Sequence, residues 1–102
     1  MIRDIILLPE AIEDVTGAHD WYESQSSGLG KEFLRNVDAC LSLAKRKPEI
    51  NRLIYKTFRR ALVRHFPFAI FYEIQGDDLV IYSVFHCAQD PKRWKRRLRT
   101  LP

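Results

Sequence analysis

The chain has 102 residues, enough for one domain with a modest hydrophobic core and too few for a second. Hydrophobic residues make up 46% and charged residues 29%, a balance typical of globular proteins that excludes a disordered chain. The formal net charge of +4 favours an acidic partner, whether nucleic acid, an anionic surface or an acidic polypeptide. Residues 2–8 do not form a signal peptide, and no apolar run approaches the roughly 20 residues of a membrane span, so we expect a soluble cytoplasmic protein.

The N-terminal part of the chain predicts a strand followed by a helix. Residues 2–8 form a short apolar run that indicates a strand, and Pro9 suits the first turn of a helix, where its missing amide hydrogen has no cost. Apolar side chains then recur at steps of three and four, at Ala11, Ile12, Val15, Ala18 and Tyr22. Acidic side chains occupy much of the opposite side, at Glu10, Glu13, Asp14 and Asp20. This spacing predicts an amphipathic helix.

A second helix is predicted after the break at Ser26, Ser27 and Gly28. Its apolar stripe consists of Leu29, Phe33, Val37, Leu41 and Ala44, and Pro48 ends it. The short connection between the two helices predicts an antiparallel helical hairpin. Cys40 falls on the apolar stripe and is expected to be a core residue.

After Pro48 the apolar period changes to two, which is typical of strands. The predicted strands cover residues 53–58, 60–66, 68–74 and 79–85, with a hairpin turn at residues 76–78. Pro91 can begin a short terminal helix that contains Trp94 and Leu98. The order of strand, helical hairpin and antiparallel strands predicts a single α+β domain over residues 1–102. We expect the hairpin to bury one face of the sheet and the other face, partly open, to hold the basic residues of the strands.

The basic residues fall into groups that could bind an acidic partner. A run at residues 45–47 is interpreted as a solvated helix end. The predicted strands carry Lys56, Arg59, Arg60 and Arg64. The terminal segment carries Lys92, Arg93, Lys95, Arg96, Arg97 and Arg99, and no acidic residue follows Asp90. Trp94 lies among these cations, either as part of a target surface or as an anchor of the terminal helix.

Few residues suggest chemistry. The chain has no phosphate-binding glycine loop, no nucleophile elbow and no Cys or His spacing that indicates a metal, so neither a metal nor a cofactor is expected. His86, at the end of the last predicted strand, could act as a general acid or base, or could instead tie the strand end to the terminal segment by a hydrogen bond. Trp21 and Tyr22 are expected to pack, because the acidic helix that carries them repels phosphate.

Four stretches, taken in order, resemble a known family. They are Trp21-Tyr22-Glu23 with Gly28-Leu29-Gly30 and Phe33-Leu34; Arg59-Arg60 with Leu62; Phe66-Pro67-Phe68 with Ile70 to Tyr72; and Val84-Phe85-His86 followed by Asp90-Pro91 and Trp94. Together they resemble the RelE/ParE superfamily, the toxins of type II toxin–antitoxin systems. The fold that this resemblance implies, a helical hairpin on an antiparallel sheet, agrees with the prediction from periodicity.

The resemblance implies one of two activities. RelE-like members are metal-independent endoribonucleases that cleave messenger RNA in the ribosome, and by position Arg60 and His86 would be the catalytic residues. ParE-like members inhibit DNA gyrase and lack that catalytic set. Cys87 stands where some of the nucleases have a tyrosine, and the spacing from His86 to Asp90-Pro91 is similar to the ParE-like plasmid stabilisation branch. We therefore predict a growth-arresting toxin that inhibits DNA gyrase, with a RelE-like endonuclease as the alternative.

Both branches imply a cognate antitoxin. Its acidic or amphipathic C-terminal segment would cover the basic face and fold as it binds. Such a toxin could form a homodimer or a heteromeric complex with the antitoxin, and the target would be DNA gyrase or the ribosome with its messenger RNA. A second alternative, from a different class, is a non-toxic basic module that binds nucleic acid.

Overall fold

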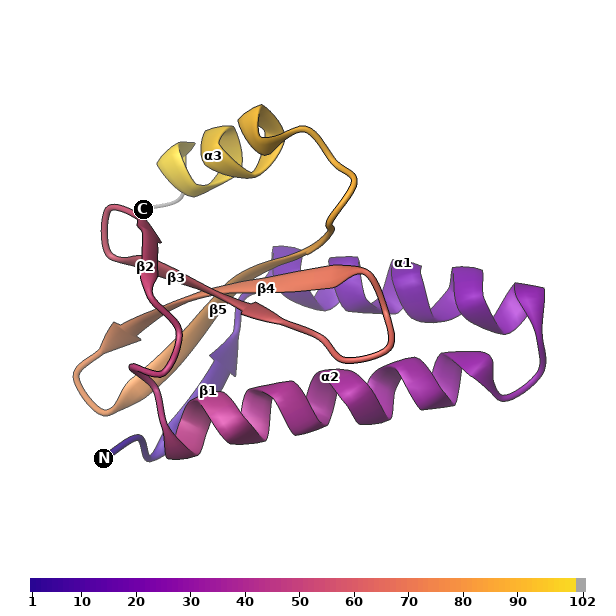
Figure 1. Ribbon diagram of the computed structural model, residues 1–102, viewed down its shortest axis with the longest axis horizontal. Helices are drawn as coiled ribbons and strands as arrows, with labels where there is room; N and C mark the ends of the chain where they lie inside the picture. Colours follow the sequence, from indigo (N-terminus) through magenta and orange to yellow (C-terminus); the bar gives the residue numbers. More distant parts are fainter. Residues whose placement is uncertain (101–102) are drawn as a thin grey trace.

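The computed structural model describes residues 1–100, without the side chain of Thr100, so the last two residues of the predicted domain lie outside the described part. The elements are β1 (Asp4–Leu7), α1 (Pro9–Gln25), α2 (Leu29–Arg46), β2 (Leu53–Tyr55), β3 (Phe58–Leu62), β4 (Phe68–Gln75), β5 (Asp78–His86) and α3 (Pro91–Thr100). The α1–α2 hairpin lies on one side of the sheet and α3 on the other (Figure 1). The predicted α+β class is confirmed.

The sheet has five strands in the order β1-β5-β4-β3-β2. The strands β2 to β5 pair antiparallel, as predicted, and the turn between β4 and β5 places Gly76 at φ 61°, a conformation that glycine adopts without strain. The sequence left the place of β1 open. In the structure β1 lies parallel to β5, with Asp4 opposite Asp78 and Leu7 opposite Ile81. The first strand, β1, therefore forms one edge of the sheet and lies next to the last strand, β5.

The turn between α1 and α2 shows why the Trp21-Tyr22-Glu23 and Gly28-Leu29-Gly30 stretches occur together. The Glu23 carboxylate accepts hydrogen bonds from the backbone N–H of Gly28, at 3.0 and 3.2 Å, and of Gly30, at 3.0 Å. Gly28 has φ 88°, which favours glycine. These bonds to the first amides of α2 hold the pKa of the Glu23 carboxyl below its usual range. The loop motif therefore stabilises the start of α2.

One core lies between the hairpin and the sheet. The α2 residues Phe33, Val37, Leu41 and Ala44 are all buried, as their spacing predicts. On α1 the stripe is narrower than predicted. Ala11 is buried and Tyr22 packs against the core, but Ile12 is 51% exposed and Trp21 is 59% exposed. Each of these two lies about 100° around the helix from its inward-facing neighbour, and the packing role predicted for Ile12 is wrong. Trp21 is mostly exposed, but its ring meets the Tyr22 ring edge-on with 5.1 Å between centroids.

A second core lies on the opposite face of the sheet, under α3. It contains Phe58, Phe71, Tyr82 and Leu98, and Trp94 stacks on Phe71 with 4.8 Å between ring centroids. The face that was predicted to be partly open is covered by α3 over this core, while Arg60 on the same face stays exposed. Trp94 and Leu98 are one turn apart on α3, so both reach the apolar side chains that the strands present on this face. Trp94 thus anchors the terminal helix.

Candidate functional site

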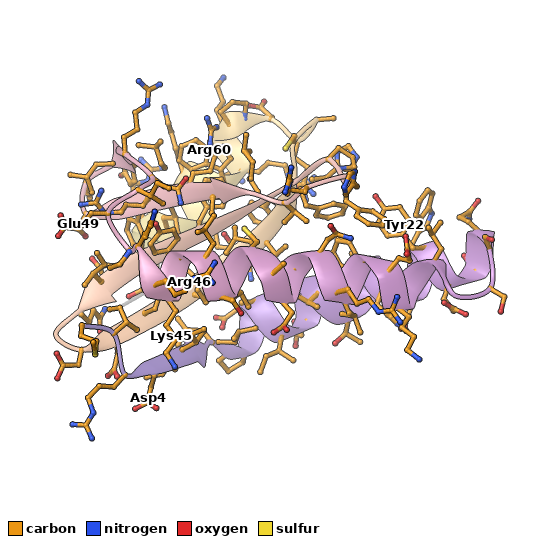
Figure 2. The ribbon with its side chains drawn as sticks, turned by 60° about the horizontal axis from the view of Figure 1, so that its bottom comes forward. Asp4, Tyr22, Lys45, Arg46, Glu49 and Arg60 are labelled. Carbon is orange, nitrogen blue, oxygen red and sulfur yellow. The ribbon has the colours of Figure 1, made fainter. Side chains whose placement is uncertain are left out.

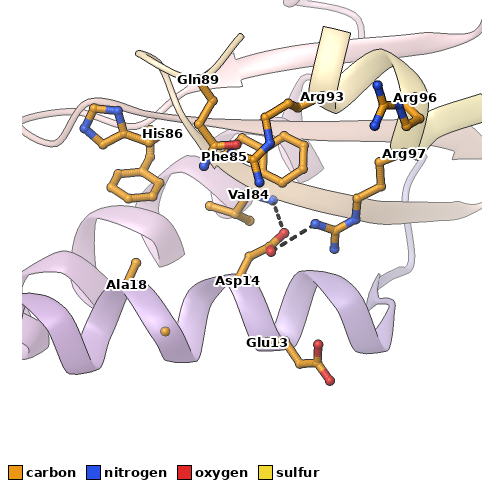
Figure 3. Close-up of a pocket in the computed structure, with 12 residues that line it drawn as sticks. Glu13, Asp14, Ala18, Val84, Phe85, His86, Gln89, Arg93, Arg96 and Arg97 are labelled. Atoms are coloured by element: carbon orange, nitrogen blue, oxygen red, sulfur yellow. Dashed lines mark hydrogen bonds and ion pairs between the residues drawn. The ribbon is translucent and has the colours of Figure 1, made fainter. Parts of the chain in front are cut away.

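A cleft of about 700 Å³ opens between α1, the end of β5 and α3 (Figure 3). Its ionisable lining residues come from three segments far apart in the chain: Glu13 and Asp14 from α1, His86 from β5, and Arg93, Arg96 and Arg97 from α3. The cleft is therefore formed by the docking of α3, which brings the terminal cations beside the acidic side of α1.

Asp14 holds the floor of the cleft together. One oxygen, Oδ1, accepts a hydrogen bond from Arg97 Nη1 at 3.0 Å, and the other, Oδ2, accepts the backbone N–H of Val84 at 2.9 Å (Figure 3). Burial raises the pKa of Asp14 above its usual range, although the hydrogen bonds from Arg97 and Val84 and the charge of Arg97 act in the opposite direction. Sequence periodicity placed Asp14 on the solvent side of its helix and missed this role. The role of Asp14 becomes visible only in the structure, where the C-terminal helix α3 lies beside α1.

Arg97 was predicted to contact the target, but its guanidinium is engaged inside the protein. Besides the ion pair with Asp14, its Cζ atom lies 5.0 Å from the centre of the Phe85 ring. In contrast, Arg93 and Arg96 are exposed and line the cleft. The cleft therefore offers two solvent-accessible guanidinium groups to an acidic group of a ligand.

His86 lies at the end of β5 and borders the cleft. Its Nδ1 accepts the backbone N–H of Ala88 at 3.0 Å, and its ring meets Phe68 edge-on with 5.2 Å between centroids. Because Nδ1 is an acceptor, a neutral imidazole carries its proton on Nε2. This bond differs from the predicted one, because His86 accepts from the loop directly after β5 and does not donate to the terminal segment. Its Nε2–H remains a donor for a ligand in the cleft.

Arg60 does not share a face of the sheet with the imidazole of His86. The β3–β4 register pairs Arg60 with Phe71, which belongs to the core under α3. The β4–β5 register pairs His86 with Phe68, which packs on the core under the helical hairpin. The two residues border a common cavity of about 100 Å³ at the end of the sheet, yet their side chains project from opposite faces. The geometry does not form a paired acid–base and cation site from them.

The remaining strand cations are also separated. Arg59 lies on the hairpin face, where its Nη1 donates to the Asn51 carbonyl at 2.6 Å. Lys56 occupies a left-handed turn position with φ 50°, and its Nζ lies 5.3 Å from the Tyr55 ring centre. Arg64 follows β3 and lines a groove beside α2. The expectation that Lys56, Arg59, Arg60 and Arg64 share one open face is wrong, since successive strand residues alternate between faces.

The terminal cations form an exposed basic group on α3. Lys92, Arg93, Lys95, Arg96 and Arg99 are exposed on α3, and Lys95 Nζ lies 5.6 Å from the centre of the Trp94 ring. Within residues 1–100, no three His, Cys, Asp or Glu side chains gather as a group that could hold a metal ion. None of the helices in this range is long and apolar enough to cross a membrane.

Comparisons with known proteins identify the family. Residues 5–91 match the family model of the ParE toxin of type II toxin–antitoxin system, parDE. Among solved structures, a chain of the chromosomal ParDE TA system from P. aeruginosa has 14% identity and a TM-score of 0.61, with 84% of this chain and 96% of that chain covered. The isolated E. coli RelE toxin has 13% identity and a TM-score of 0.55, with 95% and 97% covered. No curated protein sequence matches. Because the family model spans most of the sequence, the chain belongs to the family of ParE toxins of type II toxin–antitoxin systems.

Proposed function

We propose that this ParE-type toxin arrests bacterial growth by inhibiting DNA gyrase, which acts in the cytoplasm. The observation that carries the proposal is the placement of Arg60 and His86, whose side chains project from opposite faces of the sheet. A nuclease that uses both residues on one phosphate requires them to converge. The match to the ParE family model supports the same assignment.

The exposed cations of α3 are the proposed contact with the target. Arg93 and Arg96 extend from a helix that is fixed to the sheet by Trp94 and Leu98, so their positions are set by a rigid element. Lys92 and Lys95 add to the same positive surface. A cationic helix of this kind attracts an acidic surface, or DNA held by gyrase, over long range.

The second candidate is a ribosome-dependent messenger RNA endonuclease. It is favoured by one observation, the presence of His86 in the same cleft as Arg93 and Arg96. There His86 Nε2 could exchange a proton while the arginines hold a phosphate. The fold of RelE is shared, although at 13% identity that likeness concerns the fold alone.

Two assays with the purified chain separate these candidates. In the first, gyrase supercoils relaxed plasmid in the presence of the chain, and we expect the supercoiling to be lost. In the second, ribosome-bound messenger RNA is incubated with the chain, and we expect it to stay intact. A folded His86→Gln variant should inhibit gyrase like the unchanged protein, because no proton transfer is needed. Cleavage of the messenger RNA that disappears in His86→Gln, with a loss of about 10²-fold or more, would assign the nuclease activity instead.

Production of the chain in bacteria tests the broader assignment. A toxin should stop growth, and co-production of its antitoxin should restore it. Normal growth with confirmed folded protein would favour the non-toxic nucleic-acid-binding module.

A further inference from the structure

A second hollow, of about 390 Å³, opens beside the cleft between α1, β5 and α3. We call it the aromatic pocket, because every residue that lines it except Pro67 carries a ring: Trp21, Tyr22, Phe68 and His86. Phe68 and His86 also line the cleft, so the two hollows adjoin and form one trough. The trough is aromatic at one end and carries the arginines of α3 at the other.

The rings of the aromatic pocket are held in place from within the protein. Tyr22 meets Phe68 with 6.1 Å between ring centroids, and Phe68 meets His86 with 5.2 Å. Trp21 meets Tyr22 edge-on and is itself 59% exposed, so part of its ring is open to a ligand. Figure 2 shows Tyr22 near the end of the molecule where α1 and α2 join, well away from Arg60. An exposed indole on such a support is a surface on which a planar ligand stacks.

The opposite end of the trough binds anions. Arg93 and Arg96 are exposed and stand one turn apart on α3, so their guanidinium groups can hold neighbouring phosphate groups of one ligand. The carboxylates of the cleft oppose this only weakly. Asp14 is paired with Arg97, and the Glu13 carboxylate points away from the two arginines (Figure 3). The cleft volume of about 700 Å³ lies within the range of small-molecule sites, roughly 300–1,000 Å³.

Neutral polar groups lie between the rings and the arginines. The Gln89 side chain lines the cleft, and its Oε1 atom is buried without a hydrogen-bond partner within residues 1–100. A buried acceptor of this kind is normally satisfied, so a ligand hydroxyl or amine that donates to it stabilises the site. The Nε2–H of His86 supplies a donor beside it. In Figure 3 Gln89 lies between His86 and Arg93, where a ligand that spans the trough would carry its sugar.

The charges around the aromatic pocket favour a short ligand over a nucleic acid strand. Asp20, with a side chain that is 71% exposed, and Glu23 lie next to Trp21 on α1. A strand that continued past the aromatic pocket would bring its phosphates against these carboxylates. A single nucleotide places only its uncharged base there and keeps every phosphate at the arginine end.

We propose that the trough binds a free nucleoside triphosphate, with its base stacked on Trp21 and its phosphates held between Arg93 and Arg96. This inference goes beyond the proposed function, because it assigns a small-molecule site to the chain whatever the target is. Binding is measured on the purified chain with neither gyrase nor ribosomes present, so the two proposals fail independently.

The phosphate end is tested by titrating the purified chain with ATP in a calorimeter. Arg93→Ala combined with Arg96→Ala should weaken ATP binding by about tenfold or more, because two charge-assisted contacts are lost. Lys31→Ala with Arg35→Ala removes the same charge from exposed positions of α2 that line neither hollow, and it should change binding by about twofold at most. Equal weakening in the two double variants would show that only the net charge matters, and would overturn the site.

The aromatic end is tested at Trp21, whose exposure makes it replaceable without loss of the fold. Trp21→Ala should weaken ATP binding by about tenfold, since stacking on the base is lost, and Trp21→Phe should restore most of it. ATP should quench tryptophan fluorescence in the unchanged chain and leave it unchanged in Trp21→Phe, because the remaining Trp94 is packed on Phe71. Quenching that persists in Trp21→Phe would contradict the stacking.

Three further ligands, titrated into the unchanged chain, decide which chemistry the trough recognises. Inorganic tripolyphosphate and adenosine should each bind about tenfold or more weakly than ATP, because each fills only one end of the trough. Tripolyphosphate that binds as tightly as ATP would reduce the trough to an anion site and overturn the proposal. A single-stranded octanucleotide that binds more tightly than ATP, and is weakened by Trp21→Ala, would overturn it in favour of a nucleic acid strand. No ATP binding up to about 1 mM would also overturn it.

Discussion

Asp14 on α1 and Arg97 on α3 form an ion pair, with 3.0 Å between Oδ1 and Nη1, across 83 residues of sequence. Their side chains are 17% and 21% exposed, so the pair is partly withdrawn from water. Because Asp14 also accepts the Val84 N–H from β5, one carboxylate connects the helical hairpin, the sheet and the terminal helix. This contact and the packing of Trp94 and Leu98 fix the position of α3.

Replacing Arg97 should lower the stability of the protein more than replacing Asp14. Arg97→Ala leaves a partly buried carboxylate without its cation and should lower the free energy of unfolding by about 1–3 kcal/mol. Asp14→Asn keeps an oxygen acceptor for Val84 and removes the buried charge, so it should cost about 1 kcal/mol or less. Urea denaturation of the two variants and the double variant gives the coupling energy, expected near 1 kcal/mol. Arg99→Ala, an exposed cation on the same helix, is the control and should change stability by less than about 0.5 kcal/mol. Strict additivity would contradict a direct interaction.

The pH dependence of stability should carry a contribution from Asp14. Burial raises its pKa in the folded protein, so the folded state binds this proton more tightly than the unfolded chain does. The resulting stabilisation is complete below the unfolded pKa and is lost as the pH rises through the folded one. Glu23 and Glu73, whose pKa values are lowered, contribute in the opposite direction. The contribution of Asp14 is therefore measured by comparing the pH dependence of the unfolding free energy of Asp14→Asn with that of the unchanged chain. Between about pH 4 and pH 7, unfolding free energies of Asp14→Asn should decrease less, or rise more, than those of the unchanged chain. Parallel curves would show that Asp14 has an ordinary pKa.

The helical hairpin depends on one close approach of its helices. A Cβ atom on Gly30 would lie 2.8 Å from the backbone oxygen of His19 and 2.7 Å from its ring, so Gly30→Ala should destabilise the fold by about 1–3 kcal/mol. Gly17 is the matched control. No atom lies within 4 Å of its added Cβ, and Gly17→Ala in a helix should stabilise the fold by about 0.5–1 kcal/mol. Thermal unfolding of the two variants should therefore shift in opposite directions. A tolerated Gly30→Ala would mean that α1 and α2 separate without cost.

Two exposed arginines of α3 should carry the toxic effect. Arg93→Glu combined with Arg96→Glu reverses charge on the cleft while leaving Trp94 and Leu98 in place, so the fold should persist. Gyrase inhibition and growth arrest should fall by about tenfold or more, since two favourable charge contacts become repulsive. Lys31→Glu with Arg35→Glu makes the same charge change at exposed positions of α2 and should leave both effects intact. Full toxicity of the α3 variant with native thermal stability would remove the cleft from the mechanism.

Local patterns in the sequence were sufficient for the order and type of the elements and for one core, although β3 begins at Phe58 and ends at Leu62 where residues 60–66 were predicted. The spacing of Phe33, Val37, Leu41 and Ala44 predicts their burial, because a helix turns by a fixed angle per residue and only one of its sides can face the sheet. The turn at Gly76 and the helix start at Pro91 follow equally from local backbone preferences. The four short stretches that resemble the RelE/ParE superfamily then specified the family that the comparison confirms.

The site was decided by contacts between segments far apart in the chain. Asp14 looks like a solvated side chain in its own helix, and only the docking of α3 makes it a buried partner of Arg97. The cations of residues 56–64 look like one patch, but the pleat and the register of β3 send Arg59 and Arg60 to opposite faces. The parallel pairing of β1 with β5 likewise depends on a partner about 70 residues away. Periodicity in the sequence indicates which side of a single element faces inward. The burial and the charge of a site depend on which distant element covers that site, and the packing of the whole chain decides which element this is.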